Sequence, residues 1–471
     1  MSTSINETNK TSTLLDALRA ELSDDRVVDD PDILQGLSHD EAEWARVGRA
    51  AVAIRARTEH EVQTVVRICA ALNVPVVPRG AGTGLSGGAN AVDGCVVLDL
   101  SKMNAVLDID RANMTCTVQP GVVNNDLKAK VAEQGLWYPP DPASAPWSTI
   151  GGNVSTNAGG LCCLKYGVTR DYVLGLRAVV GGEAGYGTAV HLGRSTNKGV
   201  AGLDMAGLFV GAEGILGVVT EVTLRLRPAL TDPPRTVVGA FPDLVAAGRA
   251  VALVTSSGLI PAALELLDRQ CLVAVEEWKH LGIEAEAAAL LLARVDVAGE
   301  AGDVETAALA DCFERAGALW AAASTDPVEA EALFDARRLA YPALERLGPV
   351  LTEDLVVRRS ELPGMLADIQ AIGRKHGVQI ATIAHAGDGN VHPMFVTETG
   401  DDAARIAAQA AFEDLIDAAL ARGGTVTGEH GVGLLKRAGM LRELDPGSVT
   451  MQRAIKQALD PLNLFNPGKV L

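Results

Sequence analysis

Apolar and polar residues follow two different periods in the first hundred residues of the chain. Residues 51–57 alternate as a β-strand does, and residues 58–72 carry apolar side chains at the helical period. Thr58 and Glu61 have the spacing of a capping box, which marks the start of this helix. The apolar run 74–77 then leads directly into a glycine-rich loop. The pattern predicts strand, helix, strand and loop, the order of an α/β unit that binds phosphate.

Further elements are predicted on either side of this unit. Residues 1–45 are expected to form an amino-terminal helical arm, with four leucines on one helical face: Leu14, Leu15, Leu18 and Leu22. A helix is expected at 124–134, and short strands are expected at 95–100, 105–109, 115–118 and 218–226. From residue 228 the chain becomes rich in Ala, Leu and Glu and predicts long helices, including 284–293 and 307–323.

The glycine-rich loop, residues 78–90, contains five glycines in thirteen positions. Glycine is tolerated at this density where the backbone approaches a ligand closely, and successive N–H groups in such a loop form an anion site. The natural ligand is a phosphate or pyrophosphate. These glycines follow the second strand and do not open a helix, which disfavours a nicotinamide-type dinucleotide fold. A flexible surface loop is the alternative.

Two later segments have the same character. Residues 138–160 are rich in proline, glycine and polar residues and predict about two dozen residues of irregular backbone, longer than loops usually run without a function. Residues 211–217 form a third glycine-rich segment before the strand 218–226. We expect both segments to contact a ligand.

Composition limits the class of protein. At 471 residues, two or three domains are expected, and 48% apolar with 21% charged residues is ordinary for a soluble globular protein. A net charge of −18 argues against nucleic acid or an anionic membrane as the main partner. No apolar run approaches the ~20 residues of a membrane span. The polar amino terminus lacks a secretory pattern, which predicts a cytoplasmic protein, with peripheral membrane attachment left open.

The seven cysteines are odd in number and have no Cys-x-x-Cys spacing, so we expect reduced residues, mostly in the core. A redox role for the adjacent Cys162 and Cys163 is the alternative. An iron–sulfur pattern and an NAD fingerprint are both absent from the sequence.

Several segments together resemble the FAD domain of the vanillyl-alcohol oxidase (PCMH-type) superfamily over roughly residues 40–228. The matching stretches are PRGAGTGLSGGAN, PPDPAS, STIGGNVSTNAGG, YGVTRDYVLGLRAVV and GAEGILGVVTEVTLRLRP. The resemblance implies FAD, and it implies non-covalent binding because no histidine lies between His60 and His191. It places the pyrophosphate at Arg79, Gly80, Gly82, Thr83 and Gly84, and the flavin side at Ser148, Gly151, Gly152, Asn153 and Gly159. Glu213, Gly214 and Ile215 complete the implied site.

Three of the eight histidines lie in two short glycine-rich motifs near the end of the chain. Residues 378–384 and 391–396 alternate as two strands around a turn at 387–390, so His385 and His392 are expected side by side at one end of a hairpin. Two imidazoles suit a divalent metal, with Glu429 as the third ligand. Zinc is favoured, with manganese or iron next. Considered alone, each histidine is more often a hydrogen-bonded structural residue than a metal ligand.

These motifs extend the resemblance, since residues 228–471 resemble the carboxy-terminal substrate domain of FAD-linked D-2-hydroxyacid dehydrogenases. The family implies that a metal held by His385, His392 and Glu429 binds the substrate's α-hydroxyl and one carboxylate oxygen. It also implies His430 as general base, hydride transfer from Cα to flavin N5, and Arg337 as the cation for the substrate carboxylate. Arg338 is the fallback for Arg337, and a solvated helix charge is the alternative.

The two resemblances predict an α+β protein with a PCMH-type two-subdomain FAD-binding domain and an α+β substrate domain that combines an antiparallel sheet with helices. The predicted parts are an amino-terminal arm (1–45), the FAD-binding domain (46–228), the substrate or cap domain with the metal site (229–445) and a tail returning to the FAD domain (446–471).

The sequence favours a small substrate such as D-lactate or glycolate. Met394 stands two residues after His392, where D-2-hydroxyglutarate enzymes tend to have an asparagine that meets the distal carboxylate. The acidic pair Glu353 and Asp354 also disfavours a second carboxylate.

A D-2-hydroxyglutarate dehydrogenase and a flavin-binding subunit of a larger oxidase complex are the alternatives kept, ahead of a metal-dependent hydrolase and an ether-lipid synthase. A separate electron acceptor is expected: quinone, cytochrome, electron-transfer flavoprotein or oxygen. A homodimer is left open.

Overall fold

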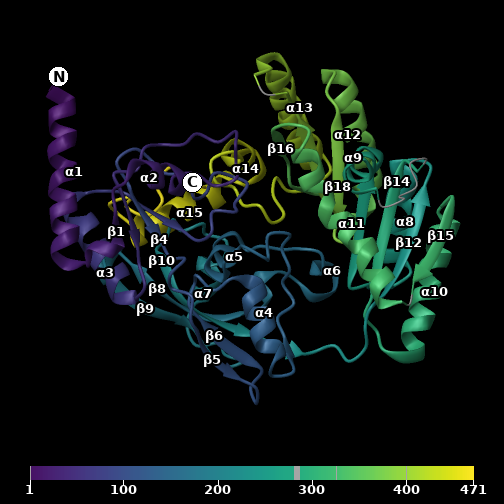
Figure 1. The fold of residues 1–471 in the computed structure, drawn as a ribbon, viewed down its shortest axis with the longest axis horizontal. Helices are drawn as coiled ribbons and strands as arrows, with labels where there is room; N and C mark the ends of the chain where they lie inside the picture. Colours follow the sequence, from purple (N-terminus) through teal and green to yellow (C-terminus); the bar gives the residue numbers. More distant parts are fainter. Residues whose placement is uncertain (1, 281–286, 325, 399) are drawn as a thin grey trace. The chain divides into compact units, whose positions relative to one another are not determined.

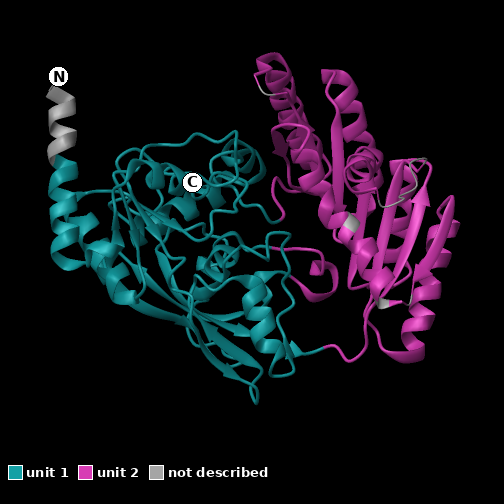
Figure 2. Cartoon of the chain, viewed as in Figure 1, with its two compact units in different colours: residues 1–158, 168–229, 429–471 teal, residues 159–167, 230–428 magenta. Residues whose placement is uncertain are grey.

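The computed structural model describes residues 2–280, 287–324, 326–398 and 400–471 (Figure 1). The chain forms two compact units. Unit 1 comprises residues 1–158, 168–229 and 429–471, and unit 2 comprises residues 159–167 and 230–428 (Figure 2). The chain therefore passes from one unit to the other four times. The longer segment of unit 2 begins at residue 230, and residues 429–445 lie in unit 1.

Unit 1 contains most of the glycine-rich segments. Its helices are α1 (Ser2–Glu21), α2 (Pro31–Leu37), α3 (Glu59–Leu72), α4 (Asn124–Ala132), α5 (Ile150–Thr156), α7 (Met205–Phe209), α14 (Arg437–Glu443) and α15 (Pro446–Leu459). Its strands are β1 (Val27–Val28), β2 (Val52–Arg55), β3 (Val76–Arg79), β4 (Val96–Asp99), β5 (Val106–Asp110), β6 (Thr115–Val118), β7 (Leu136–Trp137), β8 (Val173–Val180), β9 (Thr188–Gly193), β10 (Val218–Arg225) and β11 (Arg227–Pro228).

Two main sheets build unit 1. In the first, of order β1-β2-β4-β3, the strands β2, β4 and β3 are parallel. The second is antiparallel, in the order β5-β6-β10-β8-β9. The capping box predicted for α3 is present, and its apolar stripe lies in the core with Leu14 and Leu18 of α1. The helical arm thus packs against α3, and it also supplies a short edge strand of the first sheet, β1, that the sequence did not predict.

Unit 2 is a single antiparallel sheet with helices. Its helices are α6 (Cys163–Tyr166), α8 (Leu244–Ser256), α9 (Arg269–Lys279), α10 (Gly299–Arg315), α11 (Pro327–Glu345), α12 (Leu362–His376) and α13 (Asp402–Ala421). Its strands are β12 (Arg235–Phe241), β13 (Ala263–Asp268), β14 (Ala289–Val295), β15 (Trp320–Ser324), β16 (Val350–Thr352), β17 (Leu355–Val356), β18 (Ile380–His385) and β19 (Asn390–Val396). The order is β15-β12-β14-β13-β18-β19-β16, and β17 also pairs with β19. Helices α9 and α11 share a core with one face of this sheet.

Three sequence predictions were wrong in part. The run 284–293 was expected to be helical, but its described part contains most of β14, because a continuous apolar run suits a strand buried on both faces as well as a helix. Residues 281–286 lie outside the described part of the chain. The pattern at 307–323 ends as a helix at Arg315 and continues as the strand β15. The stretch 138–160 is not irregular throughout, since Thr149 caps the short helix α5.

The carboxy-terminal residues pack inside unit 1. Phe465 forms a parallel bridge with Val76 of β3 and lies in the core of unit 1. The Lys469 ammonium group, also buried, donates to the carbonyl oxygen of Asn90 at the end of the glycine loop. In the described part of the chain, none of the helices combines the length and the apolar character that crossing a membrane requires.

Candidate functional site

The hairpin predicted around residues 387–390 is present as β18 and β19. His385 pairs with Asn390, and His392 pairs with Ile383, two residues before His385. Residues paired across antiparallel strands, and residues two apart along one strand, point to the same face. The two imidazoles therefore share a face of the unit 2 sheet. Their ring centroids are 5.2 Å apart, and both side chains are buried.

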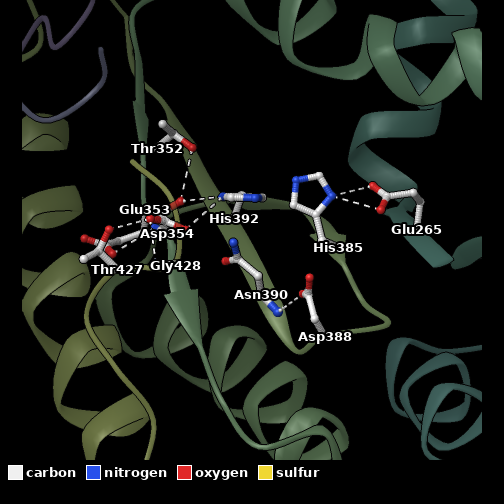
Figure 3. A network of polar contacts seen from close by, with 10 residues as sticks. All are labelled: Glu265, Thr352, Glu353, Asp354, His385, Asp388, Asn390, His392, Thr427 and Gly428. Carbon is white, nitrogen blue, oxygen red and sulfur yellow. Dashed lines mark hydrogen bonds and ion pairs between the residues drawn. The ribbon is translucent and has the colours of Figure 1, made fainter. Parts of the chain in front are cut away.

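Glu265 of β13 contacts His385 on the side of the ring that faces away from His392 (Figure 3). Its carboxylate oxygens are both 2.9 Å from His385 Nδ1, and strand pairing places the two residues directly opposite each other. The Arg337 guanidinium of α11 forms an ion pair with the same carboxylate, with Nε 2.9 Å from Oε2. Arg337 is buried, whereas its neighbour Arg338 is half exposed and pairs with Glu331 and Asp335. A solvated helix charge thus describes Arg338 and not Arg337.

His392 contacts Glu353 and Asp354. Its Nδ1 lies 3.3 Å from the carbonyl oxygen of Glu353 and 3.8 Å from Asp354 Oδ1 (Figure 3). Asp354 Oδ2 accepts hydrogen bonds from the Thr427 hydroxyl, at 2.7 Å, and from the Gly428 backbone, at 2.9 Å. Asp354 thus connects His392 to the segment at the end of unit 2. Because both Nδ1 atoms face oxygens of the protein, each ring can offer Nε2 to a metal ion.

Glu429, the third predicted metal ligand, and His430, the predicted base, directly follow Gly428 in the chain. Glu429 and His430 are the first two residues of the last segment of unit 1. The Gly428–Asp354 hydrogen bond fixes the backbone of unit 2 one residue before Glu429. In unit 1 the Ser86 hydroxyl donates to the carbonyl oxygen of His430 at 3.1 Å. The donor set of two imidazoles and one carboxylate fits a zinc-type ion.

The first glycine loop has backbone donors to offer a ligand. Between Gly80 and Leu85, no N–H group donates to an acceptor among the described residues. Gly82 has a φ of +81°, and a Cβ there would lie 2.0 Å from the Arg79 guanidinium. Arg79 itself is buried and donates to the carbonyl oxygen of His39. A run of unsatisfied N–H groups is the arrangement that binds a pyrophosphate.

All three glycine-rich segments meet in unit 1. A Cβ on Gly80 would lie 2.4 Å from the Thr149 hydroxyl, at the start of α5, and one on Gly214 would contact Pro78. The backbone of Ile215, itself buried, accepts a hydrogen bond from Lys456. The half-buried Thr83, Gly84 and Gly152 lie in the same segments, whereas Gly159 belongs to unit 2.

Some residues of the implied flavin site have a structural role inside unit 1. The Asn153 amide, which is buried, donates to the Ser148 hydroxyl and accepts from Asn124. A Cβ on Gly151 would lie 2.5 Å from Pro120, so close packing of α5 already requires glycine there. The sequence could not separate this requirement from contact with a flavin.

Glu213 is hydrogen-bonded to the backbone of the segment that carries His430. Its carboxylate accepts hydrogen bonds from the backbone of Val432, at 2.7 Å, and of Gly433, at 2.9 Å. Burial raises the pKa of Glu213 to about 7, and the negative charge of Asp40 acts in the same direction. The two N–H donors and the Lys469 charge oppose this shift. Burial in turn lowers the pKa of Lys469 to about 8.

The raised pKa of Glu213 predicts a pH-dependent stability. The folded protein holds the Glu213 proton more tightly than the unfolded chain, whose carboxyl has a pKa near 4.5, so this stabilisation is lost as the pH rises towards 7. Relative to Glu213→Gln, the free energy of unfolding of the wild type is expected to fall by up to about 3 kcal/mol between about pH 5 and pH 7.5. Thermal and urea unfolding of both proteins measure this difference. An equal difference at both pH values would contradict the assignment.

Sequence reasoning missed the most buried polar contact of the histidine pair. Glu265 stands in the strand Ala-Leu-Glu-Leu-Leu-Asp, where a carboxylate between apolar residues was the available signal. The sequence also did not indicate that Thr427 donates to Asp354 or that Asn390 lies beside Gly428. Asp354 was noted for its charge alone, and its contact with His392 was not expected.

Comparison with known proteins gives matches over nearly the whole chain. Residues 233–470 match the family described as FAD linked oxidases, C-terminal domain, and residues 50–191 match the FAD binding domain. The glycolate oxidase subunit GlcD of Bacillus subtilis (strain 168) is 40% identical over 418 residues, which cover 88% of each chain. A D-lactate dehydrogenase of Anaerostipes hadrus is 32% identical and covers 96% of this chain and 95% of its own. A D-2-hydroxyglutarate dehydrogenase of Xanthomonas citri pv. viticola is 34% identical and covers 92% of each chain.

Among solved structures, p-cresol methylhydroxylase with substrate bound aligns with a TM-score of 0.81. The alignment covers 98% of this chain and 97% of that one at 19% identity, which shows a shared fold. With the glycine-rich segments of unit 1, these matches define an FAD-linked oxidoreductase of the PCMH-type α+β fold. Within that class, the chain belongs to the family of FAD-linked oxidases.

Proposed function

We propose that the protein oxidises a small D-2-hydroxyacid to the 2-oxoacid, with FAD as the oxidant and a divalent metal ion as an electrophile. The observation that carries this proposal is the buried pair His385 and His392, two imidazoles on one face of a hairpin in an FAD-linked oxidase. The names of the relatives, a glycolate oxidase subunit, a D-lactate dehydrogenase and a D-2-hydroxyglutarate dehydrogenase, support the hydroxyacid class.

FAD would be bound without a covalent bond. The N–H groups of Gly80, Gly82, Thr83 and Gly84 would hold the pyrophosphate. The Arg79 guanidinium, which lies beside Gly82, would pack against the loop. The segments at 148–159 and 213–215 would contact the rest of the cofactor. When bound, FAD accepts the hydride equivalent that leaves the substrate's Cα.

His385, His392 and Glu429 would hold the metal ion, with zinc favoured over manganese or iron. A bound ion supplies Lewis acidity, which lowers the pKa of the substrate's α-hydroxyl. His430 would take the hydroxyl proton as general base. Arg337 would bind the substrate carboxylate, since a guanidinium makes two parallel hydrogen bonds to a carboxylate and an ammonium does not.

D-lactate or glycolate is the favoured substrate. Met394 is fully buried on β19 and offers a distal carboxylate no strong hydrogen bond. Glu353 and Asp354, both fully buried acidic residues, adjoin His392 and offer a distal carboxylate no cation. D-2-hydroxyglutarate is the alternative substrate, supported by the Xanthomonas relative. A role as the flavin-binding subunit of a larger oxidase complex is supported by the word subunit in the name of the Bacillus relative. In either role a quinone, cytochrome, electron-transfer flavoprotein or oxygen would accept the electrons.

The proposal is tested by anaerobic titration of the purified holoprotein. The absorbance of oxidised flavin is followed while D-lactate, glycolate, D-2-hydroxyglutarate or L-lactate is added, before and after chelation. We expect rapid bleaching by D-lactate or glycolate and little by L-lactate. Chelation should slow bleaching at least about a hundredfold, because the ion contributes several kcal/mol, and zinc or manganese should restore it.

Each other outcome has a definite meaning. Bleaching by D-2-hydroxyglutarate alone would move the substrate assignment to the alternative. Bleaching that survives complete metal removal would contradict the metal-assisted mechanism. Bound flavin that none of the four acids reduces would contradict the dehydrogenase assignment and favour the role as an assembly subunit.

A further inference from the structure

Glu265 has no role in the function proposed so far, and its position is costly. Its side chain is fully buried on β13, between Ala263 and Leu267, which belong to the unit 2 core. A buried carboxylate costs several kcal/mol of desolvation unless its partners repay it. An apolar residue at this position would avoid that cost. The reason for a carboxylate must therefore lie in the groups that it contacts.

One of these groups is a proposed metal ligand. Both carboxylate oxygens lie 2.9 Å from His385 Nδ1. An ionised carboxylate only accepts hydrogen bonds, so Nδ1 must carry the proton and Nε2 must carry the lone pair. In Figure 3 the His385 ring lies between Glu265 and His392, with the ring nitrogen that does not face Glu265 on the side of His392. Glu265 thus fixes both the tautomer and the ring orientation that metal binding requires.

The other group is the proposed substrate arginine. Arg337 contacts Glu265 through Nε, and its guanidinium makes no other ion pair or hydrogen bond with the residues that the structure describes. The contact at Nε is an ion pair without hydrogen-bond geometry, and it leaves the N–H groups of the two Nη atoms for another anion. The ion pair is also fully enclosed, with 6% of the Arg337 side chain and none of the Glu265 side chain exposed.

We propose that Glu265 is a positioning residue that couples the metal site to the substrate-binding arginine. This inference rests on the proposed function. One carboxylate orients His385 for the metal and Arg337 for the substrate carboxylate, so that a single group sets the geometry of both halves of the substrate-binding site. Loss of its charge should weaken metal binding and substrate binding together.

The test uses Glu265→Gln in the holoflavoprotein. The glutamine oxygen can still accept from His385 Nδ1, but the negative charge is lost and the amide NH₂ faces the Arg337 donors. In chelator-treated protein, competition with a chromophoric chelator should show zinc affinity about 10–100-fold weaker than in the wild type. With the metal saturating, KM for the hydroxyacid should rise about tenfold while kcat changes less than about threefold, since Arg337 is no longer held.

Asp268→Asn is the matched control. Asp268 lies three residues further along β13, is also buried, and accepts from the backbone of Cys271 and Thr382 instead of from the site. This variant should lose stability as Glu265→Gln does, yet keep the zinc affinity and KM of the wild type within about twofold. Equal effects from both variants would reduce Glu265 to a general structural role and overturn the proposal.

A second variant keeps the test decisive if Glu265→Gln fails to fold. In the double variant Glu265→Gln/Arg337→Met neither buried charge remains, and replacing both members of a buried ion pair is often tolerated. Its zinc affinity should still be about 10–100-fold weaker than in the wild type, because His385 has lost its carboxylate. Wild-type zinc affinity in either variant would overturn the proposal. If the wild type itself binds no zinc, the metal-assisted function fails instead, so the two failures can be distinguished.

Discussion

Replacing His392 by alanine is expected to reduce kcat/KM for the hydroxyacid at least about a thousandfold, the equivalent of some 4 kcal/mol of transition-state stabilisation. The variant removes one of the two imidazoles on the β18–β19 hairpin and leaves an acceptor at Glu353 and the Asp354 carboxylate without their contact to the ring. Anaerobic stopped-flow measurement of flavin reduction gives the rate, and metal analysis of the purified variant shows whether the ion is lost with the activity.

His376→Ala is the control for this experiment. His376 lies at the end of α12 in the same unit and contacts Asp414, away from the hairpin. Its removal should leave the rate of flavin reduction within about twofold, since a partly exposed polar contact contributes little. If His392→Ala instead kept flavin reduction within tenfold of the wild type, with bound metal, then His392 would be a structural histidine.

The hairpin was predictable because every step is local. Period-2 alternation on both sides of a four-residue turn fixes which side chains share a face, and the pairing of Ile383 with His392 follows from that register. The capping box of α3 was predictable for the same reason. The glycine loop could be recognised as an anion site because so dense a run of glycines is seldom tolerated away from a ligand, and the unsatisfied N–H groups agree with that interpretation.

The contacts that join distant residues could not be predicted. Glu265 and His385 are separated by 120 positions, and nothing in either segment specifies that β13 lies beside β18. Gly151 shows the opposite difficulty, since a glycine demanded by Pro120 has the same appearance in the sequence as a glycine demanded by a flavin. The run 284–293 was expected to be a helix because of its composition. Continuous alanine and leucine suit a buried strand such as β14 and a buried helix equally.

Arg337→Lys should reduce kcat/KM about a hundredfold or more, mainly through a higher KM. Lysine keeps the positive charge that Glu265 needs, so the variant avoids the roughly 3–5 kcal/mol penalty of leaving a buried carboxylate uncompensated. It cannot contact Glu265 and a substrate carboxylate at the same time in the planar geometry of a guanidinium. Steady-state kinetics with D-lactate and glycolate, together with an unfolding curve, separate the loss of substrate binding from any loss of stability.

The adjacent Arg338→Lys provides the comparison. Arg338 is on the exposed side of α11, where its charge pairs with Glu331 and Asp335. Exchange for lysine there should change kcat/KM less than about twofold, because exposed ion pairs contribute little to either stability or orientation. A large effect at 338 with none at 337 would reverse the assignment of the substrate arginine. We expect the large effect at Arg337 and not at Arg338. The buried ion pair with Glu265 places Arg337 beside the proposed metal ligand His385.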